Sequence, residues 1–209
     1  ALSHSYEFVF VLPRKTRIAH LVSAKELKVE TLPFIEISKR PKDVIYYLPS
    51  LIINGFALAK LVLSYNAKII HVNDYYNLTG TVVKLIFPSV KLVTHIRKLP
   101  ASSPLVLSRF WLWLHSKVSD QVICVSKEVK RQIGKKYPAI LIYDGIQDEE
   151  KYPPHHFFNG DKKEIKFLYI GHFIPGKGQD YALEAFRIAQ KKCKNIRLRF
   201  VGGDMGLKK

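Results

Sequence analysis

Short apolar runs rich in β-branched residues alternate along the chain with longer stretches of helical periodicity. The pattern predicts strands over residues 8–12, 68–72, 92–94, 122–125 and 139–143, and helices over residues 48–65, 78–86, 105–118 and 127–137. These strands are continuously apolar, which is typical of strands buried on both faces. Strand–helix–strand order with such strands predicts a parallel sheet covered by helices on both sides, so the fold class is α/β.

The alternation stops after residue 147 and then restarts. Residues 148–163 contain prolines, histidines and mixed charges without a period, as expected of a linker. Beyond it the pattern predicts a strand, a helix and a strand over residues 165–170, 181–193 and 196–201. The helix is predicted to turn four side chains inward: Ala182, Ala185, Phe186 and Ala189. A βαβ unit of roughly 45 residues cannot bury a sufficient core. We therefore expect an amino-terminal domain over residues 1–147 and a second, incomplete domain over residues 164–209.

One uncharged stretch, Val44–Ala59, resembles a membrane span. It contains Pro49 and is followed by Lys60, which leaves it short of the roughly 20 apolar residues that cross a bilayer. We interpret it as part of a buried core helix.

No signal peptide is recognisable and the chain does not begin with Met. We expect further native sequence before Ala1.

Composition narrows the class of protein. The 209 residues are 47% hydrophobic and 24% charged, the balance of an ordinary globular chain. Lys and Arg number 34 against 17 Asp and Glu, for a formal net charge of +17. The excess is spread evenly and favours anionic partners such as phosphates, nucleotides, nucleic acid or acidic lipid. Cys124 and Cys193 form neither a disulfide framework nor a metal-ligand pair, which favours a reducing compartment, the cytoplasm.

The loop after the strand at residues 165–170 has the chemistry of an anion site. Glycines allow close approach of backbone N–H groups, the following helix begins with partial positive charge, and Lys177 adds a full charge. It is not the triphosphate-binding P-loop, because Gly178 follows Lys177 where that motif has Ser or Thr. A tight turn with an exposed lysine is the alternative.

The segment FLYIGHFIPGKGQDYALEAF, residues 167–186, resembles the start of the carboxy-terminal domain in GT-B glycosyltransferases of family 4, the group 1 glycosyltransferases. Five further segments resemble the same family in the right order: IIHVND (69–74), VTHIR (93–97), DQVICVS (120–126), IYDGIQD (142–148) and VGGD (201–204).

The resemblance implies a GT-B fold, with a Rossmann-like amino-terminal domain that recognises the acceptor and a second Rossmann-like domain that holds the nucleotide. It implies retaining transfer of a sugar from a nucleotide-sugar donor, UDP- or GDP-linked, to a glycan or lipid-linked acceptor. No cofactor and no metal are expected. The implied partners include a peripheral contact with the cytoplasmic face of a membrane, and no nucleic acid.

Site residues follow from the same resemblance. It implies that His95 is catalytic, near the transferred sugar. The donor phosphates are assigned to Gly171, His172, Lys177 and Gly178. The acceptor or cleft is assigned to Asn73, Asp74, Arg97, Asp144 and Gly145. His172 stands where the family has Arg, and Asp144 where it has Asn.

Structural alternatives stay open for several of these residues. His95 is alternatively a strand-end histidine bonded to backbone. Asn73, Asp74 and Arg97 are alternatively loop caps. For Ser126, a role as a helix cap explains the residue as well as a role in ligand binding does. Two features of the family are expected outside residues 1–209: the first strand of the amino-terminal domain and the pair of glutamates that holds the donor. We therefore expect the chain alone to lack much of its donor site.

Two other readings of the function stay open. One is a non-catalytic relative that binds sugar nucleotide or a partner. The other is a basic nucleic-acid-binding protein, although no zinc spacing or RNP-like motif is present. On the helix at residues 105–118, Trp111 and Trp113 lie near Arg109 and are explained either by a membrane interface or by core packing.

Overall fold

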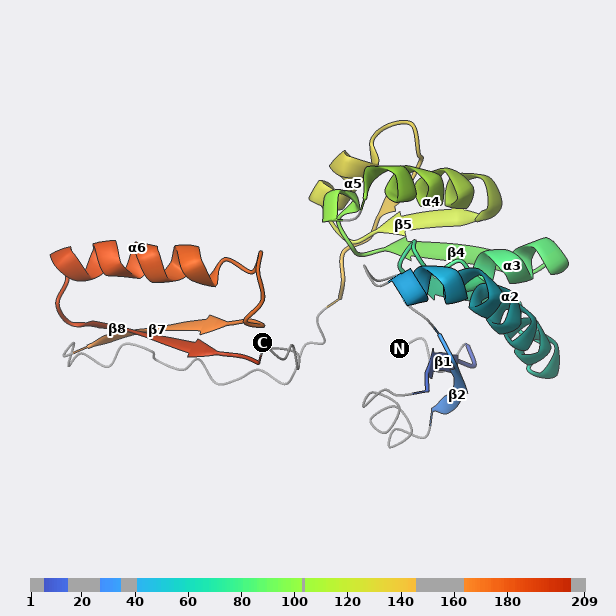
Figure 1. Cartoon of the computed structure of the whole chain (residues 1–209), viewed down its shortest axis with the longest axis horizontal. Coiled ribbons are helices and arrows are strands. Elements are labelled where there is room, and N and C mark those ends of the chain that lie inside the picture. Colours follow the sequence, from blue (N-terminus) through green and yellow to red (C-terminus); the bar gives the residue numbers. More distant parts are fainter. Residues whose placement is uncertain (1–5, 15–26, 35–40, 103, 146–163, 204–209) are drawn as a thin grey trace. The chain divides into compact units, whose positions relative to one another are not determined.

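The computed structural model describes residues 6–14, 27–34, 41–102, 104–145 and 164–203. The chain divides into two compact units, Ala1–Ile146 and Gln147–Lys209 (Figure 1). The linker predicted over residues 148–163 lies outside the described residues.

The amino-terminal unit alternates strands and helices in the predicted order, with one additional strand. Its elements are β1 (Val9–Pro13), β2 (Lys28–Leu32), α2 (Pro41–Ser64), β3 (Ile69–Asn73), α3 (Thr79–Ile86), β4 (Lys91–Ile96), the 3-10 turn η2 (Pro100–Ser102), α4 (Leu105–Val118), β5 (Gln121–Cys124), α5 (Lys127–Ile133) and β6 (Ile140–Leu141). All the strand pairs are parallel: β1 pairs with β2, and a second sheet has the order β3-β4-β5-β6. The additional strand is β2. Its sequence, KVETL, mixes charged and apolar positions and lacks the continuous apolar run that marks the other strands.

The four-stranded sheet is buried on one face and partly exposed on the other. Its strands follow one another in sequence order, so right-handed connections place α3, α4 and α5 on the same face. The strand residues that point to this face are buried: Val72, Leu92, Thr94, Ile96, Val122 and Cys124. The residues between them, such as His71 and Ile123, remain partly exposed. The prediction of strands buried on both faces is therefore wrong for the described residues, because helices cover one face only.

Helix α2 packs by one side. Its inward residues include Gly55, where an added Cβ would come 2.4 Å from Cγ1 of Val82 on α3. Glycine is required here because the two helices approach so closely. The outer side exposes a set of apolar side chains: Ile45, Tyr46, Leu48, Ile52, Ile53, Phe56 and Leu63. The prediction of a buried core helix therefore holds for one side and is wrong for the other.

Within the described residues, α2 is also the one helix long and apolar enough to cross a membrane, a test that core helices of soluble proteins also pass.

Two clusters of buried side chains form the core of this unit. One packs α4 and α5 against the sheet: Tyr75, Leu78, Ile96, Trp111, Leu112, Val122, Cys124, Val129 and Ile133. The other packs α2 and α3 against the end of β2: Leu32, Leu58, Ala59, Val62, Val83 and Val90. Trp111 thus belongs to the core, whereas Trp113 is 48% exposed. The two tryptophans of α4 point to different environments.

Asp120 connects the amino ends of β4 and β5. Its carboxylate accepts a hydrogen bond from the backbone N–H of Leu92 at 2.8 Å and forms ion pairs with Lys84 at 2.8 Å and Lys91 at 3.1 Å. These interactions hold the pKa of Asp120 well below its usual range, chiefly through the bond to Lys84. The carboxylate fixes the register of the two strands at their amino ends.

Helix α5 is shorter than predicted. Ser126 caps its start, because its hydroxyl oxygen accepts a hydrogen bond from the backbone N–H of Val129 at 3.1 Å. The helix ends at Ile133 because Gly134 adopts a left-handed φ of 74°. The described structure therefore uses Ser126 as a helix cap.

The carboxy-terminal unit is a single βαβ motif of β7 (Ile165–Ile170), α6 (Gln179–Lys192) and β8 (Ile196–Val201), in which β7 and β8 are parallel. Among its described residues, Ile196 alone is fully buried. Of the four side chains predicted to face inward, Ala182 and Phe186 are half-buried while Ala185 and Ala189 are exposed. Two strands offer α6 too narrow a surface to cover its apolar side.

Candidate functional site

The carboxyl ends of β3 and β4 bring predicted site residues together. Asn73 is the register partner of His95 on the neighbouring strand. The His95 ring stacks on the ring of His71, with their centroids 5.3 Å apart. All three side chains belong to the partly exposed face of the sheet, at the edge where open α/β sheets place ligands.

Asp74 holds the loop after β3 against the loop after β4. It is buried and has a left-handed φ of 87°, which Asp tolerates better than most residues. Its carboxylate accepts hydrogen bonds from the backbone N–H groups of Tyr75 at 3.1 Å, Arg97 at 3.3 Å and Lys98 at 3.1 Å. Asp74 thus has the contacts of a loop cap.

Arg97 and Asp144 form an ion pair at the same edge. Nη2 of Arg97 lies 2.6 Å from Oδ2 of Asp144, and both side chains are partly exposed. The pair ties the end of β4 to the segment that follows β6. Gly145 comes next, and an added Cβ there would meet no atom of the described residues within 4 Å.

The two stacked histidines favour the neutral form. Burial is the largest cause of the lowered pKa of His95, and the Arg97 guanidinium lowers it further, while the carboxylates of Asp144 and Asp74 act in the opposite direction. Burial also lowers the pKa of His71, followed by the effects of His95 and Arg97. Nε2 of His95 is buried without a hydrogen-bond partner among the described residues. A neutral imidazole with a free ring nitrogen suits a hydrogen bond to a substrate hydroxyl.

A third histidine, His115 on α4, supports this edge from inside. It is fully buried, and its Nε2 lies 2.8 Å from the carbonyl oxygen of Tyr75. A carbonyl only accepts, so Nε2 carries the hydrogen and Nδ1 accepts from Oγ1 of Thr94 at 2.9 Å. Burial lowers the pKa of His115 to about 4. The neutral imidazole connects α4, β4 and the loop that carries Asp74.

Sequence reasoning missed two of these contributors. His71 precedes Asn73 by two positions on one strand, and that spacing is a signal that both share a face. His115 has no comparable signal, because it lies among aromatic residues on an apolar helix. Its role depends on contacts with residues distant in the sequence.

In the carboxy-terminal unit, the loop between β7 and α6 is shaped by two left-handed glycines. Gly176 has φ 87° and Gly178 has φ 84°, and Gly178 immediately precedes α6. The Tyr169 hydroxyl donates to the Lys177 carbonyl oxygen at 2.5 Å, which fixes the backbone of the turn. The Lys177 and His172 side chains are exposed and have no hydrogen-bond or ion-pair partner in the described part of the chain. Their charge and hydrogen-bonding capacity are available to a ligand.

The end of β8 supports this loop from behind. An added Cβ at Gly202 would lie 1.8 Å from the carbonyl oxygen of Gly171, so the two backbones touch. The backbone N–H of Phe173 also donates to the carbonyl oxygen of Gly203 at 2.9 Å. The two glycines after β8 thus brace the predicted phosphate loop. Across the described ranges, no cluster of three His, Cys, Asp or Glu side chains has the arrangement of a metal site.

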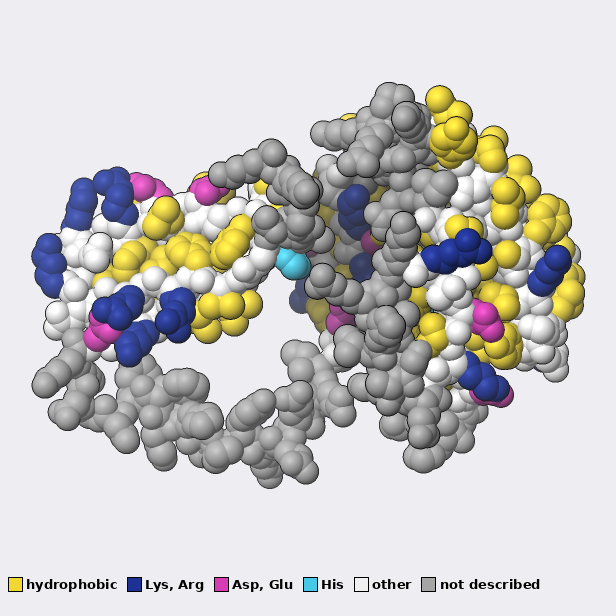
Figure 2. Space-filling model, turned by 60° about the horizontal axis from the view of Figure 1, so that its bottom comes forward, with side chains coloured by type: hydrophobic (Ala, Val, Ile, Leu, Met, Phe, Trp, Pro, Cys, Tyr) yellow, Lys and Arg dark blue, Asp and Glu magenta, His cyan; other side chains and the backbone are white. Residues whose placement is uncertain are grey.

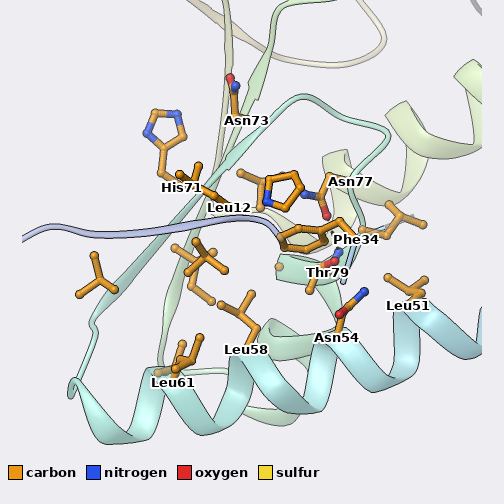
Figure 3. A pocket seen from close by; sticks show the side chains of 18 of the residues that line it. Leu12, Phe34, Leu51, Asn54, Leu58, Leu61, His71, Asn73, Asn77 and Thr79 are labelled. Carbon is orange, nitrogen blue, oxygen red and sulfur yellow. Dashed lines mark hydrogen bonds between the residues drawn. The ribbon is translucent and has the colours of Figure 1, made fainter. Parts of the chain in front are cut away.

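A cavity of about 860 Å³ lies beside β3 and α2 (Figure 3). Its lining reaches His71 and Asn73 but does not include His95, Arg97 or Asp144. Most of its surface is apolar. It adjoins the polar edge described above through His71 and Asn73.

Comparisons with known proteins agree with the architecture. No family model matches the sequence. The chain is 29% identical over 146 residues to an uncharacterized glycosyltransferase from Methanocaldococcus jannaschii, an alignment that covers 66% of this chain and 39% of the relative. MurG from Acinetobacter baumannii superposes with a TM-score of 0.51 and 8% identity over 95% of this chain and 58% of MurG. The spinosyn rhamnosyltransferase SpnG, solved with spinosyn aglycone, gives a TM-score of 0.47 and 10% identity over 95% of this chain and 58% of that protein.

The class of fold follows from these results. The parallel α/β structure and the likeness to MurG show a GT-B fold, and the sequence resembles a glycosyltransferase. The chain spans well under two thirds of the length of each of these proteins.

Proposed function

We propose that this chain is part of a retaining glycosyltransferase of family 4, which transfers a sugar from a UDP- or GDP-sugar to a glycan or lipid-linked acceptor without a metal. The observation that carries the proposal is the loop before α6. There, two left-handed glycines present Lys177 at the start of a 14-residue helix in a chain with the GT-B fold.

The chemistry of transfer explains why such a loop is needed. The bond between the anomeric carbon and the donor phosphate oxygen breaks, and the nucleoside diphosphate leaves with additional negative charge. The acceptor oxygen bonds to the anomeric carbon, and its proton passes to the oxygen of the departing diphosphate. The Lys177 ammonium and the backbone N–H groups at the start of α6 stabilise the departing diphosphate. His172 contributes a hydrogen bond.

The amino-terminal unit supplies a different group. His95 presents a buried ring nitrogen without a described partner, beside Asn73 at the ends of neighbouring strands. In this proposal the neutral imidazole binds a hydroxyl of the transferred sugar. Arg97 and Asp144 lie at the same edge. In this proposal the acceptor can therefore contact one positive and one negative side chain there.

The exposed apolar side of α2 supports a peripheral contact with the cytoplasmic face of a membrane. Phe56 and Ile53 are exposed on this helix next to Lys60, and hydrophobic side chains gather along one margin of the amino-terminal unit (Figure 2). An apolar helix face on a protein of net charge +17 suits an anionic bilayer. Vesicles containing anionic lipid should sediment the protein, and Phe56→Glu should reduce the sedimented fraction more than Phe173→Glu on the other unit.

Calorimetric titration with UDP and GDP tests the donor site. Saturable binding of one nucleotide is expected, and Lys177→Ala should weaken it about tenfold, roughly the effect of one directed charge-assisted hydrogen bond. Lys191→Ala is the matched control, because it removes the same charge at the far end of α6. Equal losses in both variants would show that the affinity reflects net charge alone.

A mixed-sequence oligonucleotide, titrated at two salt concentrations, tests the nucleic-acid alternative. Saturable, strongly salt-dependent binding of the oligonucleotide without nucleotide binding would contradict the proposed function. Nucleotide binding without turnover by the longest available form of the protein would favour the non-catalytic relative.

A further inference from the structure

We propose that His71 is a positioning residue for His95. Its stacked ring sets the plane of the His95 imidazole, and thereby the direction in which Nε2 of His95 bonds a hydroxyl of the transferred sugar. This role rests on the proposed function in giving His95 a sugar hydroxyl to bind. The effect of His71 on the His95 ring is measured without turnover, so the two can fail separately.

Strand register brings the two rings together. Asn73 on β3 is the register partner of His95 on the parallel strand β4, and His71 lies two residues before Asn73. Residues two apart on a strand share a face, so His71 lies on the face of the sheet that carries His95. The ring centroids of His71 and His95 are 5.3 Å apart and the ring planes differ by 30°. At this separation aromatic rings attract one another.

The His95 side chain does not fix its own ring plane. Rotation about the last side-chain bond of histidine is broad and roughly two-fold, so the ring can turn unless a neighbour holds it. A hydrogen bond at a ring nitrogen lies in the plane of the ring, so this plane determines where a bound hydroxyl sits. Nε2 of His95 is buried without a partner among the described residues, so no hydrogen bond with them holds the ring at that atom. The stacked ring of His71 supplies the constraint.

The charged neighbours of His95 are engaged elsewhere. Arg97 follows two residues later on the same strand, but its Nη2 lies 2.6 Å from Oδ2 of Asp144, which holds the guanidinium towards the segment after β6. The carboxylate of Asp74 is buried and accepts hydrogen bonds from backbone N–H groups. Among the described residues, His71 supplies the one ring that stacks on His95.

The same stack covers His95 from solvent. His95 is half-buried, and the His71 ring that lies against it is exposed. Burial is the largest cause of the lowered pKa of His95. Burial also lowers the pKa of His71, and the charge of His95 lowers it further. Both the plane and the neutral state of the His95 imidazole therefore depend on the ring beside it.

NMR spectroscopy of the 209-residue chain measures the stack. His71→Ala uncovers the His95 ring, so the pKa of His95 should rise towards the ordinary value of 6.5. At a pH well above both pKa values, the carbon-bound ring protons of His95 should move downfield, because they lose the ring current of the stacked imidazole. His71→Phe keeps a flat ring and should leave the pKa lowered and the ring protons upfield. The charged groups that act on His95, which are Arg97, Asp144 and Asp74, are unchanged in both variants.

A control variant separates stacking from the general loss of a side chain. Ile69→Ala shortens a residue on the same face of β3, two positions before His71, and should leave the His95 titration unchanged. His71→Leu fills the site without a flat ring and replaces His71→Ala if that variant fails to fold by circular dichroism. His95 signals that are unchanged in His71→Ala, or changed equally in His71→Phe or Ile69→Ala, overturn the proposal.

Turnover by the longest available form of the protein tests whether the stack serves transfer. His71→Ala should lower kcat roughly tenfold while KM for the donor changes little, because a misdirected hydrogen-bonding group costs rate rather than donor affinity. His71→Phe should restore most of the lost rate.

The outcomes distinguish the two proposals. An unchanged kcat in His71→Ala, with the NMR signals of His95 altered, overturns the positioning role and leaves the proposed function standing. Absence of turnover in the natural sequence contradicts the proposed function, and the NMR titration then decides the effect of His71 on His95 by itself.

Discussion

Nε2 of His115 donates a hydrogen bond of 2.8 Å to the carbonyl oxygen of Tyr75, 40 positions away in the sequence. Tyr75 follows Asp74, so this buried bond positions the loop at the end of β3. The hydrogen bond that Nδ1 accepts from Oγ1 of Thr94 requires the neutral imidazole, because a protonated Nδ1 cannot accept.

Protonation of His115 should therefore govern acid stability. The folded-state pKa, about 4, lies below the ordinary value of 6.5, so the unfolded chain binds the extra proton first. The stabilisation is complete above pH 6.5 and is lost as the pH falls from 6.5 towards 4. The difference is on the order of 3 kcal/mol. Urea unfolding at several pH values measures it, and His115→Gln should flatten the profile in this window. A profile that the variant leaves unchanged would contradict the assignment.

The neighbours of His95 should shift its titration in opposite directions. Replacing Arg97 by Gln removes a positive charge, so the pKa of His95 should rise. Replacing Asp144 by Asn removes a negative charge, so the pKa should fall further. NMR titration of the imidazole protons distinguishes the two variants. Shifts of the same sign would show that loop rearrangement rather than charge dominates.

Glycines after β8 should differ sharply in their tolerance of a methyl group. Gly202→Ala places Cβ against the Gly171 carbonyl, whereas an added Cβ at Gly203 meets no atom of the described residues within 4 Å. Hydrogen exchange in β7 should accelerate at least tenfold in the first variant and remain unchanged in the second. Nucleotide affinity should follow the same order. Similar exchange rates in both variants would exclude the proposed brace.

Loss of the Asp74 carboxylate should destabilise the loop at the polar edge. Asp74→Ala removes acceptors for the N–H groups of Tyr75, Arg97 and Lys98, and places Ala at a left-handed φ. The expected loss is about 2–3 kcal/mol in the free energy of unfolding. Asp74→Asn keeps an oxygen and tolerates the backbone, so it should lose less. Denaturant melts measure both variants, and equal losses would point to an effect of charge alone.

Apolar patterning predicted the order of strands and helices well, because continuous runs such as residues 165–170 have few alternatives. It missed β2, whose polar residues belong to a strand paired on one side only within the described residues. It also misjudged the outer side of α2, because periodicity identifies an apolar helix without showing what covers each side.

The candidate site was less accessible to sequence reasoning. Motif spacing placed Asn73, His95 and Arg97 at strand ends, where the structure has them. Loop capping was an open alternative for Asp74, but its bonding partners and the contacts of His115 were not predictable, because they join residues that approach one another only after the sheet has formed.

Asp120 shows how the two ends of the sheet differ in their tolerance of change. Its ion pairs and backbone bond secure β4 and β5 at their amino ends, far along the strands from Asn73 and His95. Side chains at the carboxyl ends therefore contribute less to holding the strands in order. Substitution of Asn73, whose side chain is exposed, is therefore expected to cost less folding stability than substitution of Asp120.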